Sequence, residues 1–310
     1  MLDYNLFVLN NGKTLILFVM VKIIKRVKIY VIIALAWALL ITIVPTQVAR
    51  ASAQMPFYNL QPKFLTVRSQ FYTTYTNSPE ERKTNVATAV KSLNNVLVDV
   101  GGEFSFNRTV GPRTESRGYK SAKIIVNGKF VDGVGGGVCQ VSTTLYNAIL
   151  LAGLKITEYH PHSLPVSYIA PSFDAMVNSG SADLRFINTT NNPIIIMATA
   201  DGDRVKISIL GEPMKEKYIR QSIITEYIEP PDDLVIPDQL NQYPDLLQGQ
   251  IMVVQSAKCG CTSQGVLIKT VNGKVVSQTV FRHDKYAPVK RVIVQGMAHN
   301  NQNTLKKIAK

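Results

Sequence analysis

GGGVCQVSTT, residues 135–144, joins three consecutive glycines to the start of a segment with helical periodicity. Apolar residues then recur at spacings that place them on one face of an α-helix: Val141, Leu145, Ala148, Ile149 and Ala152. Gly153 follows at a position where helices commonly end in the left-handed conformation. The pattern predicts a glycine loop that leads into a helix, with Cys139 at or near the helix N-terminus.

The thiol of Cys139 is the group that such a loop and helix would activate. Unpaired amides and the dipole at a helix N-terminus favour an anion, so we expect a lowered thiol pKa and a larger thiolate fraction. The same amides would stabilise an oxyanion formed when the thiolate attacks a carbonyl. Gly135, Gly136 and Gly137 would leave room for a substrate. A buried and unreactive thiol is the alternative that the sequence leaves open.

Two glycine-rich nucleotide motifs are excluded, and no cofactor is expected. A phosphate-binding loop needs Lys followed by Ser or Thr after its glycines, and Gly137 has no such successor. The dinucleotide motif fails because Val138 stands where its last glycine belongs. A closed zinc site needs four ligands, whereas Cys259 and Cys261 have only His283 as a third, so we predict no metal. A redox-labile or disulfide-linked cysteine pair stays open.

A thiolate nucleophile needs a base, and two histidines follow Cys139. His160 and His162 are two residues apart on a predicted strand, so both side chains would point to one face. Either imidazole could pair with Cys139, and the other could position a substrate or water. Asp174 is the best candidate to orient the catalytic imidazole, and Asn178 is a weaker one.

Further elements are expected on both sides of this segment. A helix is predicted with Ser78 as N-cap, Pro79 as its first residue and Glu81 as its third. Its apolar stripe consists of Val86, Val90, Leu93 and Leu97, and Gly101-Gly102 would end it. Asn127-Gly128 between apolar runs predicts a hairpin, and short strands are expected at 104–106, 184–186 and 194–197. These elements predict an α+β domain with a mixed sheet and few helices.

Several segments of this region resemble the VanW domain family. They are Gly102–Asn107, Val110–Thr114, Gly118-Tyr119, Gly135–Ala148, His160–Ser163 and Asp174-Ala175. The resemblance runs from about Phe71 to Met197 and departs at Ser172, where the family usually has glycine, which bears on the loop that holds Asp174. It implies a cysteine-dependent L,D-transpeptidase with Cys139 as nucleophile, from a family first associated with glycopeptide (vancomycin) resistance. Beside the three glycines, the predicted substrate-binding residues are Gln140, Ser142, Thr143 and Tyr146.

The C-terminal region is expected to be an elongated all-β module. Strands are predicted at 219–227 and 250–254, and Asn272-Gly273 predicts a second hairpin. The region resembles a five-glycine (G5) domain through the following glycines: Gly249, Gly260, Gly265, Gly273 and Gly296. This resemblance implies a wall-associated module that binds glycans or spaces the first domain from the wall.

The N-terminal segment predicts export. Lys22, Lys25, Arg26 and Lys28 precede an uncharged run at 29–44, and Ala51-Ser52-Ala53 offers a cleavage site. We expect residues 1–53 to be a signal peptide or an uncleaved membrane anchor, with translation starting at Met20 as a hypothesis. The predicted division is then 54–211 for the VanW-like domain, 212–296 for the β module and 297–310 for a basic tail.

Two functions of different class follow. The net charge of +13 comes without arginine and lysine runs of the nucleic-acid type, so a basic exported protein in an anionic cell wall is favoured over a nucleic-acid binder. The first hypothesis is acyl transfer on peptidoglycan stem peptides through a thioester at Cys139. The second is a non-enzymatic accessory or adhesion protein that binds peptidoglycan or wall glycans. In both, the membrane is contacted only through the N-terminal segment.

Overall fold

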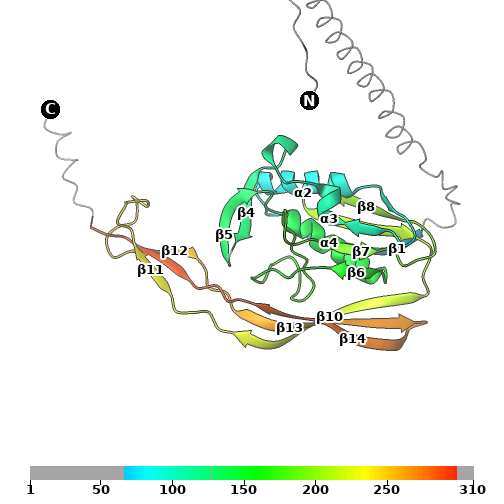
Figure 1. Ribbon diagram of the computed structural model, residues 1–310. Helices are drawn as coiled ribbons and strands as arrows, with labels where there is room; N and C mark the ends of the chain where they lie inside the picture. The colour runs from blue at the N-terminus through cyan, green and yellow to red at the C-terminus, as the bar shows by residue number, and fades with distance from the viewer. Residues whose placement is uncertain (1–65, 127, 299–310) are drawn as a thin grey trace, which may run out of the picture. The chain divides into compact units, whose positions relative to one another are not determined.

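The computed structural model describes residues 66–126 and 128–298 (Figure 1). The predicted signal or anchor, the Met20 start and most of the basic tail lie outside the described residues. Within the described ranges, no helix combines the length and hydrophobicity that a membrane crossing needs.

The first part of the described chain consists of short strands around two longer helices. Its elements are β1 (Thr66–Thr74), α2 (Glu80–Leu93), β2 (Val96–Val98), β3 (Glu103–Ser105), α3 (Phe106–Val110), a 3-10 turn η2 (Glu115–Arg117), β4 (Ser121–Val126), β5 (Lys129–Val134), α4 (Val138–Leu151), β6 (Lys155–Glu158), β7 (Arg185–Ile187), β8 (Ile194–Ala200) and β9 (Arg204–Gly211). They form a four-stranded sheet in the order β1-β9-β8-β2, a three-stranded sheet β3-β7-β6 and the hairpin β4-β5.

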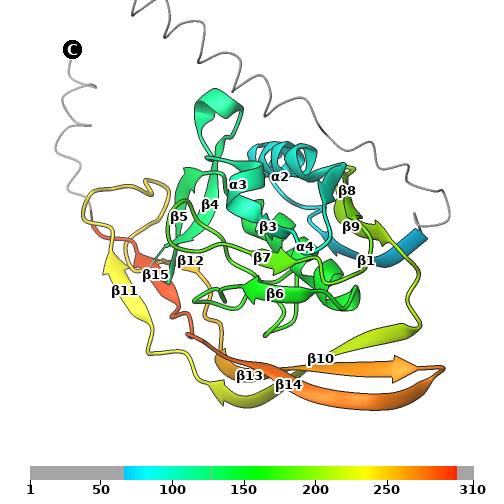
Figure 2. The ribbon, with the colours of Figure 1, turned by 45° about the vertical axis from the view of Figure 1, so that its right-hand side comes forward.

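Helix α4 is the centre of this region. Twelve of its residues are buried, and it contacts β1 and β9 of the four-stranded sheet, β6, α2 and β10 (Figures 1 and 2). These neighbours surround the helix and cover both its apolar residues and its buried polar ones. Gly153 follows the helix at a φ of 68°, as the sequence predicted. The interior therefore forms around the same segment that carries Cys139.

The structure is mostly β with few helices, as the sequence predicted. The prediction of a mixed sheet in the first domain, however, was wrong. Every strand pair of the β1-β9-β8-β2 and β3-β7-β6 sheets is antiparallel. The one parallel pair among the described strands joins β11 to β15 in the C-terminal region, where β12 pairs with β15 antiparallel.

Three local predictions need correction. Pro79 rather than Ser78 stands at the N-cap of α2, in extended conformation and without a side-chain cap bond. The helix ends at Leu93, because Asn95 takes a left-handed φ of 64° and redirects the chain into β2, so Leu97 lies on a strand and is exposed. Phe106 begins α3 instead of ending a strand, since the Ser105 side chain accepts a bond from the Arg108 amide and caps the helix.

The remaining chain is all β. Its strands are β10 (Glu216–Ile228), β11 (Leu234–Pro237), β12 (Ile251–Gln255), β13 (Gly260–Val271), β14 (Lys274–Tyr286) and β15 (Val292–Gln295), which form the sheets β10-β13-β14 and β11-β15-β12. Both hairpins predicted from Asn-Gly pairs are present, since β4 pairs with β5 and β13 with β14 across them. Because β10 contacts α4 directly, the division at residues 211 and 212 stays a prediction.

Candidate functional site

Cys139 is the second residue of α4 and is half-buried. Gly137 occupies the N-cap at a φ of 107°, a left-handed conformation that a side chain would strain, and no side chain caps the helix. The Cys139 Sγ lies 3.3 Å from the carbonyl oxygen of Val177, to which the thiol donates. The nucleophile predicted from the sequence therefore lies in the first turn of the helix, at an N-terminus without a side-chain cap.

His162 and Asp174 meet beside Cys139. The His162 Nδ1 is 2.7 Å from the Asp174 Oδ2, and the same oxygen accepts the His162 backbone amide at 2.6 Å. Both side chains are nearly inaccessible, at 5% and 1% relative exposure. With Nδ1 bonded to the carboxylate, Nε2 is the ring nitrogen left to interact with Cys139, and the thiol and the imidazole shift each other's pKa. Cys139, His162 and Asp174, hereafter the triad, have the order nucleophile, base and orienting acid.

His160 does not share this site. β6 ends at Glu158, so the two histidines lie on a loop and the alternation expected of a strand does not apply. His160 Nε2 instead pairs with Glu158 Oε1 at 2.9 Å in a half-exposed position. The weaker candidate Asn178 does not orient His162 either. Its side-chain oxygen instead accepts the backbone amides of Ser181 and Ala182. His162 is therefore the histidine that the structure joins to Cys139.

The electrostatics of the triad favour an ion pair. Burial would raise the pKa of the Cys139 thiol, but the hydrogen bond and charge of His162, together with the nearby Arg113, lower it. Burial would lower the pKa of His162, yet its bonds to Asp174 and Cys139 raise it to about 9. Burial likewise opposes the ionised Asp174, and His162, Arg282 and Tyr286 outweigh it and lower the carboxyl pKa. Cys139 and His162 thus each stabilise the charged form of the other.

Two residues of β14 complete the surroundings of Asp174, and the sequence analysis missed both. Tyr286 donates its hydroxyl to Asp174 Oδ1 at 2.5 Å. Arg282 Nη1 donates to the Asp174 carbonyl oxygen at 2.8 Å, and its Nη2 lies 3.4 Å from Oδ1. Arg282 is itself buried and paired with Asp284 at 2.6 Å. These partners follow Asp174 by more than a hundred residues, so no local pattern in the sequence indicates them.

Ser172 explains how the loop tolerates a residue other than glycine. It adopts a left-handed φ of 63°, the conformation for which glycine is the usual choice. Its amide donates to the Tyr286 Oη at 2.8 Å, and its hydroxyl bonds to that of Ser263 at 2.7 Å. Gly265 permits this approach, because a Cβ there would lie 3.0 Å from the Ser172 carbonyl oxygen. Contacts with β13 and β14 thus stabilise the left-handed conformation of Ser172.

The side chains predicted to bind substrate along α4 are interior residues. Gln140, Ser142, Thr143 and Tyr146 are each at most 1% exposed. Gln140 donates to the Thr73 hydroxyl, Ser142 donates to the Ala175 carbonyl oxygen, Thr143 accepts the Ala175 amide and Tyr146 accepts from Arg282. Their polar atoms are thus bonded within the protein: Gln140 connects α4 to β1, and Tyr146 connects it to β14. Ser142 and Thr143 connect it to the loop that carries Asp174.

The space beside the three glycines, which was expected to admit a substrate, is occupied by other parts of the protein. A Cβ on Gly136 would lie 2.7 Å from the Lys123 carbonyl oxygen, so β4 fills that space. On Gly135 it would lie 2.9 Å from the Arg113 Cβ, and on Gly137 it would lie 2.7 Å from the Arg82 Nη1. The glycines therefore admit a neighbouring strand and two arginines to the start of α4.

The other cysteines are free thiols. Cys259 is exposed with its sulfur 4.0 Å from Glu229 Oε2, and Cys261 is buried on β13. They are not joined in a disulfide, so that option for the pair is not realised here.

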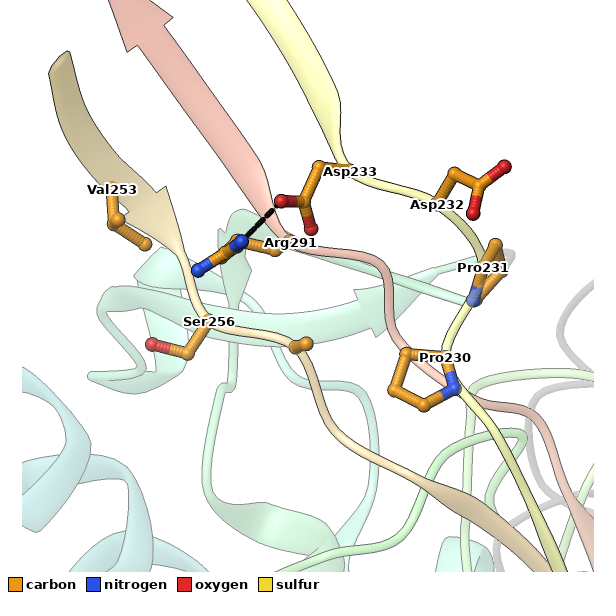
Figure 3. Close-up of a pocket in the computed structure, with 8 residues that line it drawn as sticks. Pro230, Pro231, Asp232, Asp233, Val253, Ser256 and Arg291 are labelled. Carbon is orange, nitrogen blue, oxygen red and sulfur yellow. Dashed lines mark hydrogen bonds and ion pairs between the residues drawn. The ribbon is translucent and has the colours of Figure 1, made fainter.

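A wide hollow of about 990 Å³ lies in the C-terminal region, where Figure 3 shows the ion pair between Asp233 and Arg291. It is lined by Pro230, Pro231, Asp232, Asp233, Val253, Ser256, Ala257 and Arg291, none of which belongs to the triad. It contains no nucleophile with a neighbouring base, so the triad is the stronger candidate for chemistry.

Comparison with known proteins identifies two regions of the chain. Residues 81–210 match the family model described as VanW like protein, and residues 233–298 match the model of the G5 domain. The resemblance read from the sequence is therefore confirmed. All three members of the triad lie within the first match, whereas Arg282 and Tyr286 lie within the second.

Curated relatives cover part of the chain. The "Uncharacterized protein YoaR" of Bacillus subtilis (strain 168) is 41% identical over 152 residues, which are 49% of this chain and 50% of the relative. The "Vancomycin B-type resistance protein VanW" of Enterococcus faecalis (strain ATCC 700802 / V583) is 31% identical over 143 residues, which are 44% of this chain and 50% of the relative. The chain thus spans about half the length of these relatives.

Two solved G5 structures match a smaller share. The "IgA1 Protease G5 domain structure" is 26% identical and covers 27% of this chain and 92% of its own, with a TM-score of 0.18. The "Crystal structure of HP0197-G5" is 17% identical and covers 27% of this chain and all of its own, with a TM-score of 0.14. Both scores are low, so the assignment of the C-terminal region rests on the family model.

Proposed function

We propose that this chain, which carries a VanW-like domain followed by a G5 domain, is a cysteine acyltransferase acting on peptidoglycan stem peptides. The observation that carries the proposal is the triad: a half-buried thiol at the start of α4, a histidine that lowers the pKa of this thiol, and a buried carboxylate bonded to the histidine. A thiolate with a positioned base and orienting acid is the arrangement of covalent acyl-transfer catalysis.

The reaction divides into two steps with balanced proton movement. The Cys139 thiolate attacks the carbonyl before a terminal D-residue, and the His162 imidazolium gives its proton to the departing amine as the thioester forms. An amine of a neighbouring stem then attacks the thioester, His162 takes up its proton, and the new amide releases Cys139. Asp174 keeps the imidazole oriented throughout, since its Oδ2 holds Nδ1.

The start of α4 would stabilise the negative charge on the carbonyl oxygen. Gly137 provides no side-chain cap, and the amides of Val138 and Gln140 donate to the carbonyl oxygens of Gly135 and Gly137. The Cys139 amide has no such bond among the described residues and would be the donor to an anion. The helix dipole adds a favourable field at the same place. Together these groups form an oxyanion site for the tetrahedral intermediate.

Product analysis tests the proposal. The full chain is incubated with a stem tetrapeptide as donor and a second stem as amine acceptor, and products are identified by mass. We expect a cross-linked dimer and one released terminal residue per cross-link, both abolished in Cys139→Ala and retained in the matched control Cys259→Ser. Full cross-linking by Cys139→Ala would refute the proposal. Release without cross-links would identify water as acceptor and make the enzyme a peptidase.

A second candidate is a non-enzymatic wall-binding protein, and the G5 match favours it independently of the triad. In this function the C-terminal region holds an exported protein in the cell wall, where the positive net charge suits an anionic matrix. Purified sacculi would then retain the protein without any change in their muropeptides, and Cys139 would resist iodoacetamide near neutral pH. Retention together with cross-linking would instead assign binding to the β module and catalysis to the triad.

A further inference from the structure

Two arginines lie on either side of the loop that leads to Cys139. Arg82 extends from α2 and lies against Gly137, where a Cβ would be 3.0 Å from its Cγ. Arg113 comes from the segment between α3 and η2 and lies against Gly135, where a Cβ would be 3.2 Å from its Cγ. The absence of side chains at Gly135 and Gly137 thus makes room for the side chains of two arginines beside the loop that leads to Cys139.

Neither guanidinium has a carboxylate partner among the described residues. Arg82 Nη2 donates to the amide oxygen of Gln140 at 2.6 Å. Arg113 Nη1 donates to the amide oxygen of Asn107 at 2.8 Å and to the carbonyl oxygen of Gly111 at 3.2 Å. A guanidinium carries five N–H donors, so each arginine retains donors for another group. Arg282, in contrast, is buried with the carboxylates of two aspartates.

Half-burial without a carboxylate in direct contact is unfavourable for a cation. Asp183 attracts Arg113 only from beyond ion-pair distance and is itself paired with Arg185. Burial accordingly lowers the pKa of both Arg82 and Arg113. The one anion that interacts with both is the thiolate of Cys139, which also faces the imidazolium of His162. Together with the Asp174 carboxylate that pairs with His162, three positive groups face two negative ones, which leaves one positive charge in excess. A site with this balance suits a ligand that brings its own negative charge.

We propose that Arg82 and Arg113 bind the free carboxylate of the terminal residue of the donor peptide. This inference rests on the proposed acyl transfer and assigns the part of the substrate that the site recognises. The carboxylate belongs to the residue that leaves, one residue beyond the attacked carbonyl, so cations flanking the nucleophile are placed to hold it. Planar guanidinium forks match the two oxygens of a carboxylate. The enzyme then acts on chain ends and excludes internal peptide bonds, which lack this charge.

Binding without chemistry tests the inference. Full-length Cys139→Ala is titrated by calorimetry with two stem tetrapeptides that differ only at the C-terminus, a free acid and a primary amide. We expect the acid to bind at least tenfold more tightly than the amide. Arg82→Gln and Arg113→Gln, each in the Cys139→Ala background, are expected to reduce this acid-to-amide ratio severalfold. The exposed Arg204→Gln serves as the matched control and is expected to keep the full ratio.

The two ligands act as internal references, since any general loss of folding weakens both. Equal affinity for acid and amide in the parent protein overturns the inference, and this comparison needs no arginine variant. The inference is also overturned if Arg82→Gln and Arg113→Gln both keep the full acid-to-amide affinity ratio. An acid preference that depends on the arginines, in a protein whose intact Cys139 releases no terminal residue, supports the carboxylate site and refutes the proposed acyl transfer.

Discussion

Replacement of Asp174 by Asn tests whether the triad is electrostatically linked. The Asp174 carboxylate accepts the backbone amide and Nδ1 of His162 on Oδ2, and the Tyr286 hydroxyl on Oδ1. Asparagine has nearly the same shape but one acceptor oxygen and no charge. Its oxygen can serve His162 or Tyr286, and its amide group then faces the other donor. The imidazolium loses its counter-ion, and the Cys139 thiolate loses part of the positive charge that stabilises it.

The size of the effect follows from His162. Its pKa is raised from 6.5 to about 9. At about 1.4 kcal/mol per pKa unit, that rise represents roughly 3 kcal/mol, which Asp174 and Cys139 share. If Asp174 supplies half, its removal lowers the His162 pKa by about one unit and weakens the ion pair by a similar energy. We expect the pKa of Cys139 to rise as well, so that the pH at which its alkylation rate is half-maximal shifts upward.

The assay is the rate of iodoacetamide alkylation between pH 5 and 10, followed by mass of the Cys139 peptide. The exposed Cys259 of the same molecules is the internal reference. Asp284→Asn is the matched control, because Asp284 pairs with Arg282 and its loss costs stability without removing the partner of His162. A pH profile of folded Asp174→Asn that superimposes on that of the unaltered protein would refute the electrostatic reasoning.

Three further outcomes are expected. Gly136→Ala places a Cβ 2.7 Å from a backbone oxygen of β4, so we expect a loss of about 1–3 kcal/mol in urea unfolding; an unchanged midpoint would show that the loop has room. Tyr286→Phe removes the 2.5 Å bond to Asp174 and should cost about 1–3 kcal/mol in the same assay, whereas no loss would deny β14 this role. The raised pKa of His162 gives stability that is complete below pH 6.5 and is lost as pH rises through about 9. The lowered pKa of Cys139 has the opposite effect: it gives stability that is present at high pH and is lost as pH falls through the folded-state pKa. Cys139→Ala should therefore lose stability across this window while the unaltered protein changes little, and parallel pH curves would contradict the ion pair.

Local signals in the sequence were sufficient for several elements. Asn272-Gly273 specifies a tight hairpin because both residues accept positive φ, and the structure has both at positive φ between β13 and β14. The apolar spacing after Cys139 and the glycine at 153 likewise predicted α4 and its end. In such cases the residues that determine the conformation are neighbours in the chain.

The site was predicted less completely, because its geometry depends on contacts between distant segments. The sequence offered two equivalent histidines, and only the packing of Asp174 against His162 distinguishes them. Arg282 and Tyr286 reach the site because β14 packs against the loop of Asp174, which no periodicity reveals. Polar residues on α4 were predicted to face substrate, whereas the surrounding elements bury twelve residues of the helix, these polar ones included.

The most direct test of the account is a search for the covalent intermediate on Cys139. The full chain is mixed with a free-acid donor tetrapeptide in the absence of acceptor, quenched in acid and analysed by intact mass and peptide mapping. The account predicts an adduct equal to the donor acyl group without its terminal residue, attached to the Cys139 peptide and removed by hydroxylamine. Release of the terminal residue with no adduct at Cys139, or an adduct that persists in Cys139→Ala, would contradict it.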